Sequence, residues 1–362
     1  MRYKHLIFLL FISLGSSIFA QLSKTHYIPP LTSSDGFTDQ YIYISTPKNS
    51  NVSYKITAIG QPDLAQYSGV VSNGNPVEQA VLDNGGAPIF FGETQLHVSD
   101  TNISITQKFT DKGFIVEASD VIYVSVRVRS SGGQFHAGAL VSKGSAAPGT
   151  RFRIGGFVRE INPANAHSTF ASIMALEDNT TVDLSDLPSG ATYPTGTPIP
   201  TSVVLNENET FVVVARATMD PRDIIGKLIT SDKPIVVNSG STQGSFGNSN
   251  GQDYGFDQIV GADKIGTEYI TVKGDGANSI ENVLIIADEN NTEIFINGSS
   301  VSTINAGERF VAEGTFYNAN GNMYINTSKN VFVYQGIGQS GSTVGAADAN
   351  QSLFFVPPLS CE

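Results

Sequence analysis

The strongest constraint on the fold of this chain is an internal repeat, in which four blocks of sequence recur in the same order. The first block is GTRFRIGGF, which begins at Gly149 and recurs as GTEYITVKG from Gly266. The other three pairs are SIMALEDNTTVDL with VLIIADENNTEIFI, VVLNENETFVVV with STINAGERFVAE, and GKLITSDKPIVVNSG with NMYINTSKNVFVYQG. Self-similarity of this kind is typical of a chain built from equivalent structural units.

A third and more divergent copy precedes these two. YIYISTPKNSNVSYKI, from Tyr41, matches the second block, and GFIVEASDVIYVSVRV, from Gly113, matches the last. We therefore predict three units, over residues 41–145, 149–245 and 266–340, within one repeat domain that spans residues 21–362.

The units are predicted to be all-β. Short apolar or alternating runs are bounded by Gly, Asn, Asp, Ser or Pro, and helical patterns are almost absent. In ALEDNTTV, the residues before Thr180 are typical of a hairpin tip, because Asx side chains tolerate left-handed backbone angles. In ITSDKPIVV we expect a turn over residues 231–233 and a new strand that begins at Pro234.

The architecture that we favour is a β-propeller of six or seven blades, with two blades in each unit. The near-duplicates HYIPPL (residues 26–31) and FFVPPL (residues 354–359) fit a closed ring whose first and last strands share a blade. The second copy could equally open a further unit. A row of tandem β-sandwiches is the alternative architecture.

The N-terminus has the pattern of a secretory signal peptide over residues 1–20. Arg2 and Lys4 precede an apolar run, and the small residue Ala20 marks the expected cleavage site. No later segment is long and apolar enough to span a membrane. The formal net charge of −12 argues against nucleic acid as a partner.

The residues that could carry chemistry do not form a known catalytic or metal-binding pattern, so we expect no enzyme activity, metal or cofactor. The histidines of the mature part lack metal-ligand spacing and are expected at the surface or in turns: His26, His97, His136 and His167. Glu177 with Asp178, or Asp253 with Asp257, could form a glycosidase pair, but a turn role is favoured. The only cysteine, Cys361, is an incidental thiol or has a partner in another chain or in a continuation of this one.

The most distinctive segment is SGSTQGSFGNSNGQDYGFDQ, which we expect to be a long polar loop over residues 239–258. Long loops on a rigid β scaffold often carry binding, and this one ends in aromatic and carboxylate side chains. The candidate ligand-binding residues are therefore Asp253, Tyr254, Phe256 and Asp257. A connector between units is the competing interpretation.

Four of the motifs resemble a known family. LEDNTTVDL, LNENETFVV, GKLITSDKPIVVNSGS and IGTEYIT are similar to the N-terminal domain of IgGFc-binding protein. That domain also occurs in secreted and surface proteins of Bacteroidetes bacteria, including gliding-motility-associated ones. SKTHYIPPL and FFVPPLSC are similar to the flavobacterial versions. The resemblance implies an extracellular binding or adhesion module without catalytic residues, and assigns no individual binding residue.

We therefore expect a secreted or cell-surface, non-catalytic binding protein whose ligand is a glycan or an extracellular protein. A propeller-type enzyme that acts on glycosides would need two facing carboxylates in a central cleft. A structural spacer in a secreted assembly would need no ligand. The residues that converge in the folded chain distinguish these hypotheses.

Overall fold

The computed structural model describes residues 21–33, 37–60, 66–82, 97–99, 107–130, 136–158, 168–188, 199–215, 220–246, 253–338 and 351–359. The predicted signal peptide and Cys361 lie outside this part of the chain. The described residues form β-strands and short 3-10 turns, and no α-helix is found among them. Within the same ranges, no helix has the length and hydropathy that a membrane span requires. The all-β prediction is confirmed.

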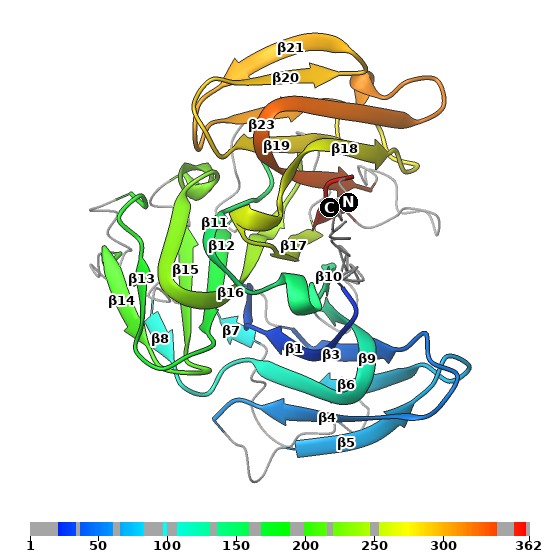
Figure 1. Cartoon of the computed structure of the whole chain (residues 1–362). Coiled ribbons are helices and arrows are strands. Elements are labelled where there is room, and N and C mark those ends of the chain that lie inside the picture. The colour runs from blue at the N-terminus through cyan, green and yellow to red at the C-terminus, as the bar shows by residue number, and fades with distance from the viewer. Residues whose placement is uncertain are drawn as a thin grey trace, which may run out of the picture.

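Three curled sheets make up the molecule, and we call them lobes 1 to 3 (Figure 1). Lobe 1 contains β1 (Ser23–Ile28), β3 (Asp39–Ser45), β4 (Val52–Ala58), β5 (Gln66–Val71), β6 (Val77–Leu82), β9 (Phe114–Arg129) and β10 (Ala137–Val141). Lobe 2 contains β11 (Gly149–Arg153), β12 (Thr169–Ala175), β13 (Thr180–Asp183), β14 (Ser202–Leu205), β15 (Thr210–Ala215), β16 (Leu228–Gly244) and β17 (Asp253–Ile259), with β8 (Gln107–Phe109) at its edge. Lobe 3 contains β18 (Gly266–Val272), β19 (Val283–Ala287), β20 (Thr292–Ile296), β21 (Ser299–Ile304), β22 (Arg309–Ala312), β23 (Asn322–Ile337) and β24 (Ser352–Phe355).

Smaller elements lie outside the three sheets. The strands β2 (Leu31–Ser33) and β7 (His97–Ser99) form a separate parallel pair. The 3-10 turns are η2 (Gly144–Ala146), η3 (Pro221–Ile224), η4 (Ala262–Lys264) and η5 (Gly314–Phe316). Two of these turns, η2 and η4, lie between consecutive lobes in the chain.

The three lobes share one topology, as the sequence repeat predicts. The central strand order is β5-β4-β9-β3-β6 in lobe 1, β14-β13-β16-β12-β15 in lobe 2 and β21-β20-β23-β19-β22 in lobe 3. In each lobe one further strand precedes this set and another follows it, and both pair with the long strand β9, β16 or β23. Each lobe therefore contains seven equivalent strands, and four of them pair directly with the long strand.

The long strand corrects one prediction from the sequence. Residues 231–233 do not form a turn, because β16 runs unbroken from Leu228 to Gly244. The extra residues are absorbed as a bulge: Arg151 of β11 pairs with Thr230, whereas Gly149 pairs with Ile235. A bulge of this kind bends a strand and increases its twist, so the sheet curls here instead of ending.

The predicted hairpin tips are confirmed. Asn179 and Asn291 have φ angles of 53° and 57°, in the left-handed region that Asn tolerates. The hydroxyl groups of Thr180 and Thr292 donate to the carbonyl oxygens of Glu177 and Glu289, at 2.7 and 2.8 Å. The same turn thus recurs at the same place in lobes 2 and 3.

The propeller interpretation is not supported in the form in which we predicted it. Each unit forms one curled sheet instead of two blades. The terminal strands also do not share a sheet, because β1 pairs with β9 in lobe 1 and β24 pairs with β23 in lobe 3. The near-identical HYIPPL and FFVPPL segments therefore belong to different lobes.

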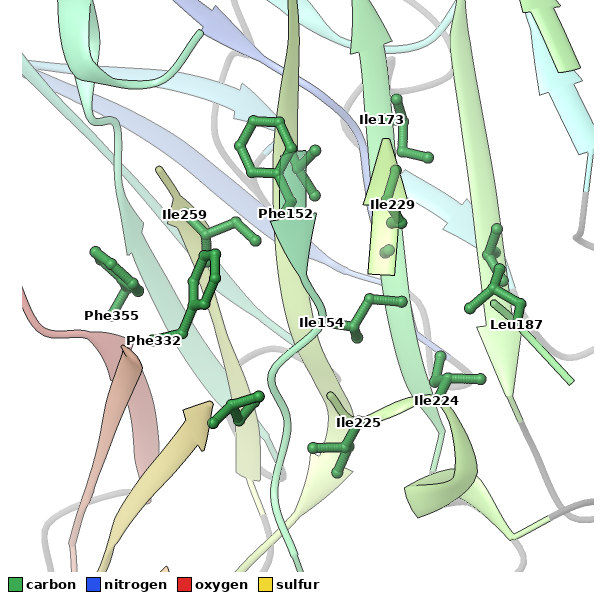
Figure 2. Close-up of a cluster of buried hydrophobic side chains, with 14 of the residues drawn as sticks. Phe152, Ile154, Ile173, Leu187, Ile224, Ile225, Ile229, Ile259, Phe332 and Phe355 are labelled. Carbon is green, nitrogen blue, oxygen red and sulfur yellow. The ribbon is translucent and has the colours of Figure 1, made fainter. Parts of the chain in front are cut away.

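The core is continuous from lobe to lobe. One buried cluster combines the interior of lobe 1 with Phe170, Val212 and Val214 of lobe 2. A second combines the interior of lobe 2 with one face of lobe 3, and Figure 2 shows Phe332 and Phe355 of lobe 3 beside Ile259 of lobe 2. A third cluster fills the interior of lobe 3. Burial of this apolar surface fixes lobe 2 between its two neighbours.

Candidate functional site

The strand β17 lies at the centre of the molecule, between β10 of lobe 1 and β24 of lobe 3 (Figure 1). It carries all four candidate residues, which we had expected in a loop over residues 239–258. That expectation was wrong, because residues 239–244 complete β16 and Asp253–Ile259 form β17. Every residue of β17 is buried.

The two aspartates of β17 join the three lobes. Oδ1 of Asp253 accepts a hydrogen bond from the Ala137 amide of β10, and Oδ2 accepts one from the Gln351 amide next to β24, both at 3.0 Å. Burial raises the pKa of Asp253 to about 6, against the effect of these two amide bonds.

Asp257 repeats this arrangement four residues further along β17, on the same face of the strand. It accepts hydrogen bonds from the Val141 amide at 2.8 Å and from the Phe355 amide at 3.0 Å. It also forms a buried ion pair with Lys143, at 2.6 Å. Four side-chain oxygens on one strand thus replace the ladder hydrogen bonds that are absent between these neighbouring strands.

The aromatic candidates lie on the face of β17 that is turned toward lobe 1. The Tyr254 and Phe256 rings are stacked with centroids 6.0 Å apart, and the Phe37 ring meets that of Tyr254 edge-on at 5.2 Å. A Cβ atom on Gly138 would lie 2.6 Å from the Tyr254 Cβ, so glycine is required for β10 to approach this closely. The structure thus brings the four residues together as a buried support, and their role in binding a ligand stays a prediction.

A polar network between lobes 1 and 2 was missed by sequence reasoning. His26, which we expected at the surface, is fully buried. Its Nε2 atom lies 3.0 Å from the Ile122 carbonyl oxygen, which can only accept, so Nε2 carries the proton of the neutral ring. Burial lowers the pKa of His26 to about 4.

The network continues through side-chain amides. The Ser142 hydroxyl lies 3.0 Å from both His26 Nδ1 and Gln258 Oε1. Gln258 donates to the Tyr27 carbonyl, and Asn238 donates to that of Pro29, each at 2.8 Å. These bonds hold the end of β1 and the residue that follows it against the face of lobe 2.

Equivalent faces of the three lobes differ in what covers them. In lobe 2, Phe170 and Phe256 pack against lobe 1. In lobe 3, Leu284 and Tyr334 pack against lobe 2, where the Tyr334 hydroxyl donates to the Arg153 carbonyl at 2.9 Å. The matching face of lobe 1 is directed instead at the junction with lobe 3, where a cleft of about 750 Å³ remains.

This cleft is the candidate functional site. Lobe 1 contributes one wall, the start of β10 contributes a floor of small residues, and lobe 3 contributes the opposite edge. The described lining residues are Tyr41, Tyr43, Glu78, Arg127, Val128, Arg129, Ala137, Gly138, Ala139, Ile337, Gln351 and Ser352. Asp253 lies beneath the floor and fixes the spacing of β10 and β24, since it binds the amides of Ala137 and Gln351.

Two Tyr and two Arg side chains form the wall of lobe 1, which we call the Tyr–Arg face. The Arg127 guanidinium lies 4.7 Å from the centroid of the Tyr43 ring, and that of Arg129 lies 6.0 Å from the Tyr41 ring. Arg129 also pairs with the buried Asp39 at 2.8 Å. Among the described residues, no carboxylate lies within ion-pair distance of Arg127.

Glu78 is the single carboxylate in the described lining. It pairs across the sheet with Tyr43. Burial, with Glu78 as a further cause, raises the pKa of Tyr43 to about 12, so its hydroxyl stays protonated at neutral pH. The wall therefore offers a guanidinium and a hydroxyl as donors, with one carboxylate as an acceptor.

The repeat contains a signal for this site that our reading of the sequence did not use. Arg127 of lobe 1 aligns with Gly240 of lobe 2 and Gly336 of lobe 3. This alignment superposes the last repeat block of the three units, GFIVEASDVIYVSVRV, GKLITSDKPIVVNSG and NMYINTSKNVFVYQG. At Gly336 a Cβ atom would lie 2.5 Å from the Phe246 ring of lobe 2. At Gly240 a Cβ atom would lie 2.2 Å from the Gly255 carbonyl oxygen of the same lobe. Both lobes therefore exclude a long side chain at this position, whereas in lobe 1 Arg127 is exposed.

The comparisons with known proteins identify the class. The family model described as "IgGFc binding protein" matches residues 137–361, so the chain belongs to this family. The match covers β10, lobe 2 and lobe 3, and the Tyr–Arg face of lobe 1 precedes it. Neither a curated protein nor a solved structure gave a significant match. Within the described residues, no group of three or more His, Cys, Asp or Glu side chains is placed to hold a metal ion.

Proposed function

We propose that this protein is a secreted or cell-surface binding module, without catalytic activity, and that its ligand binds in the cleft between lobes 1 and 3. The single observation that supports this most is the Tyr–Arg face. Its counterparts in lobes 2 and 3, among them Phe170 and Leu284, are buried, whereas here two exposed arginines and two tyrosines line an open cleft. A volume of about 750 Å³ is in the range of ligand-binding sites.

Membership of the family supports a binding role, and the ligand class that we propose is an extracellular glycan or protein. The immunoglobulin Fc region that the family's name refers to is one ligand to test. The acidic net charge of −12 supports solubility outside the cell and argues against nucleic acid. Secretion through the predicted signal peptide would give a mature N-terminus at Gln21, which N-terminal sequencing of the exported protein would detect.

The alternative of a glycoside-acting enzyme is less well supported. Glycosidases need two carboxyl groups that flank the scissile bond. The described lining of the cleft contributes one, Glu78, while Asp253 and Asp257 are buried and bonded to backbone amides.

The test is a binding screen of the mature chain against immobilised glycans, extracellular matrix proteins and immunoglobulin Fc. Tyr43→Ser in the cleft is compared with Arg309→Ser, which alters a separate cavity of about 640 Å³ at the boundary between lobes 2 and 3. We expect a bound ligand that Tyr43→Ser weakens and Arg309→Ser does not. A panel without any ligand would favour the structural-spacer hypothesis, and equal binding by wild type and Tyr43→Ser would place the site elsewhere.

A further inference from the structure

We infer that the ligand of the cleft is an acidic oligosaccharide, whose carboxylate binds the guanidinium of Arg127. This inference rests on the proposed function, because it names the ligand class of the same site. The chemistry of the Tyr–Arg face and the shape of the cleft each support it.

The charge of Arg127 is available for a ligand. Arg129 already has the buried partner Asp39, and Glu78 is engaged by Tyr43 across the sheet. Arg127 is exposed, and its contact is with the Tyr43 ring, which restrains the guanidinium without neutralising it. A guanidinium presents paired N–H groups that match a carboxylate. The Tyr–Arg face can therefore bind one carboxylate of a ligand, through Arg127.

The rest of the cleft suits a sugar chain. The floor consists of Ala137, Gly138 and Ala139, which leave room for a flat ring. Around it, the accessible side chains of Glu78 and Ser352 can exchange hydrogen bonds with hydroxyl groups. Hydroxylated rings need many short polar contacts, and this lining supplies donors and acceptors on both sides.

A folded protein ligand fits the same cleft less well. A stable protein interface buries about 800 Å² on each partner, on a broad surface with a central apolar anchor. The cleft is recessed between two lobes, and its small floor residues offer no deep apolar pocket. Its width is also fixed from below, because Asp253 and Asp257 hold both β10 and the chain beside β24. A narrow, polar ligand is favoured for these reasons.

The experiment uses the mature chain and a matched pair of probes. One probe is a series of hexuronic acid oligosaccharides of three to six residues. The other is the same series after reduction of each carboxyl group to a primary alcohol. We expect the acidic series to bind at least ten times more tightly than the reduced series, with an affinity that falls as salt is added.

Variants then locate the contact. We expect Arg127→Ser to weaken binding of the acidic series about 10- to 100-fold, as for loss of a charge-assisted hydrogen-bonded pair. Arg127→Lys keeps the charge but loses the paired geometry, and should fall between wild type and Arg127→Ser. Lys55→Ser is the control: the Lys55 side chain, which pairs with Glu117 on β9, is 41% exposed and does not line the cleft.

Two results would overturn the inference while the proposed function stands. One is equal binding of acidic and reduced sugars. The other is a neutral glycan or a protein that binds wild type and Arg127→Ser equally but is weakened by Tyr43→Ser. If no probe binds and no ligand in the screen responds to Tyr43→Ser, the proposed function and this inference both fail.

Discussion

His26 shows how one residue links the fold to pH. Its pKa in the folded protein is lowered to about 4 by burial, whereas an exposed imidazole titrates near 6.5. Between these values the unfolded chain binds a proton that the folded chain does not. The stability contributed by neutral His26 is therefore present above pH 6.5 and lost as the pH falls toward 4, by about 3 kcal/mol in all.

His26→Phe should remove this dependence, and the other lobes indicate that an aromatic ring fits, since they have Phe152 and Tyr269 at the matching position. We expect the unfolding free energy of the variant minus that of wild type to increase by about 3 kcal/mol between pH 7 and pH 4, because only wild type loses stability through His26. Urea denaturation of both proteins at the two pH values measures this.

Asp253 has the opposite sign, because its pKa is raised to about 6 and protonation stabilises the folded state as the pH falls through that value. Its contribution is common to wild type and His26→Phe, so it cancels in the comparison. A difference between the two proteins that is the same at pH 7 and pH 4 would contradict the assignment to His26.

The same residues show what the sequence could and could not predict at this scale. Asn179 was correctly placed in a hairpin tip because its role is local and set by its own backbone. His26 and Asp253 could not be placed, because their surroundings come from segments far away in the chain. Each bonds groups more than 90 residues distant: His26 to Ile122 and Ser142, Asp253 to Ala137 and Gln351.

At the scale of elements, the segment that follows β11 packs against lobe 3 and joins it to lobe 2. Gly155 lies against the Tyr334 ring, and a Cβ atom there would be 2.4 Å from two ring atoms. Tyr334 is fully buried and bonded to the Arg153 carbonyl, so it cannot move aside. Gly155→Ala should therefore destabilise the protein by about 1–3 kcal/mol, as over-packing does.

Gly74→Ala is the matched control, because nothing lies within 4 Å of a Cβ atom at that turn position. Both substitutions restrict the unfolded chain equally, so their difference reports the contact with Tyr334. Chemical denaturation should show Gly74→Ala to be neutral or slightly stabilising. Equal stability of the two variants would show that Gly155 is not packed against the Tyr334 ring of lobe 3.

The sequence predicted the repeated elements well but not their continuity. The periodicity located the strands, and the turn residues located the hairpin tips, because both signals are local. SDKP has the composition of a turn, yet it lies inside β16, where β13 pairs with the residues at its start and β12 pairs with the residues that follow it. A bulge and a turn use the same residue types, and only the tertiary pairing distinguishes them.

At the scale of the whole molecule, the central lobe makes the three lobes one cooperative unit. One apolar cluster joins lobes 1 and 2, and another joins lobes 2 and 3. The aspartates of β17 add hydrogen bonds to the strands of both neighbours. Neither outer lobe can therefore open fully without exposing apolar surface of lobe 2.

This arrangement predicts that a substitution that destabilises one outer lobe also destabilises the other. Ile42 is fully buried in lobe 1, and Ile42→Ala is expected to lower the free energy of unfolding by about 2–5 kcal/mol. Hydrogen exchange of the most protected amides of β23, in lobe 3, should accelerate by the same free energy, because they exchange only through global unfolding.

Val333→Ala in lobe 3 is the reciprocal change, and it should accelerate exchange in β9 of lobe 1 in the same way. Independent lobes would instead confine each effect to the lobe that carries the substitution. If each substitution accelerates exchange in the opposite lobe, the outer lobes unfold together. The cleft between lobes 1 and 3 then keeps its width as long as the molecule is folded, because both walls are held by the same central strand, β17. A site of fixed width can select a ligand by its shape without a closing motion. The small floor residues and the guanidinium of Arg127, which the Tyr43 ring restrains, fit a site that is already formed before the ligand binds.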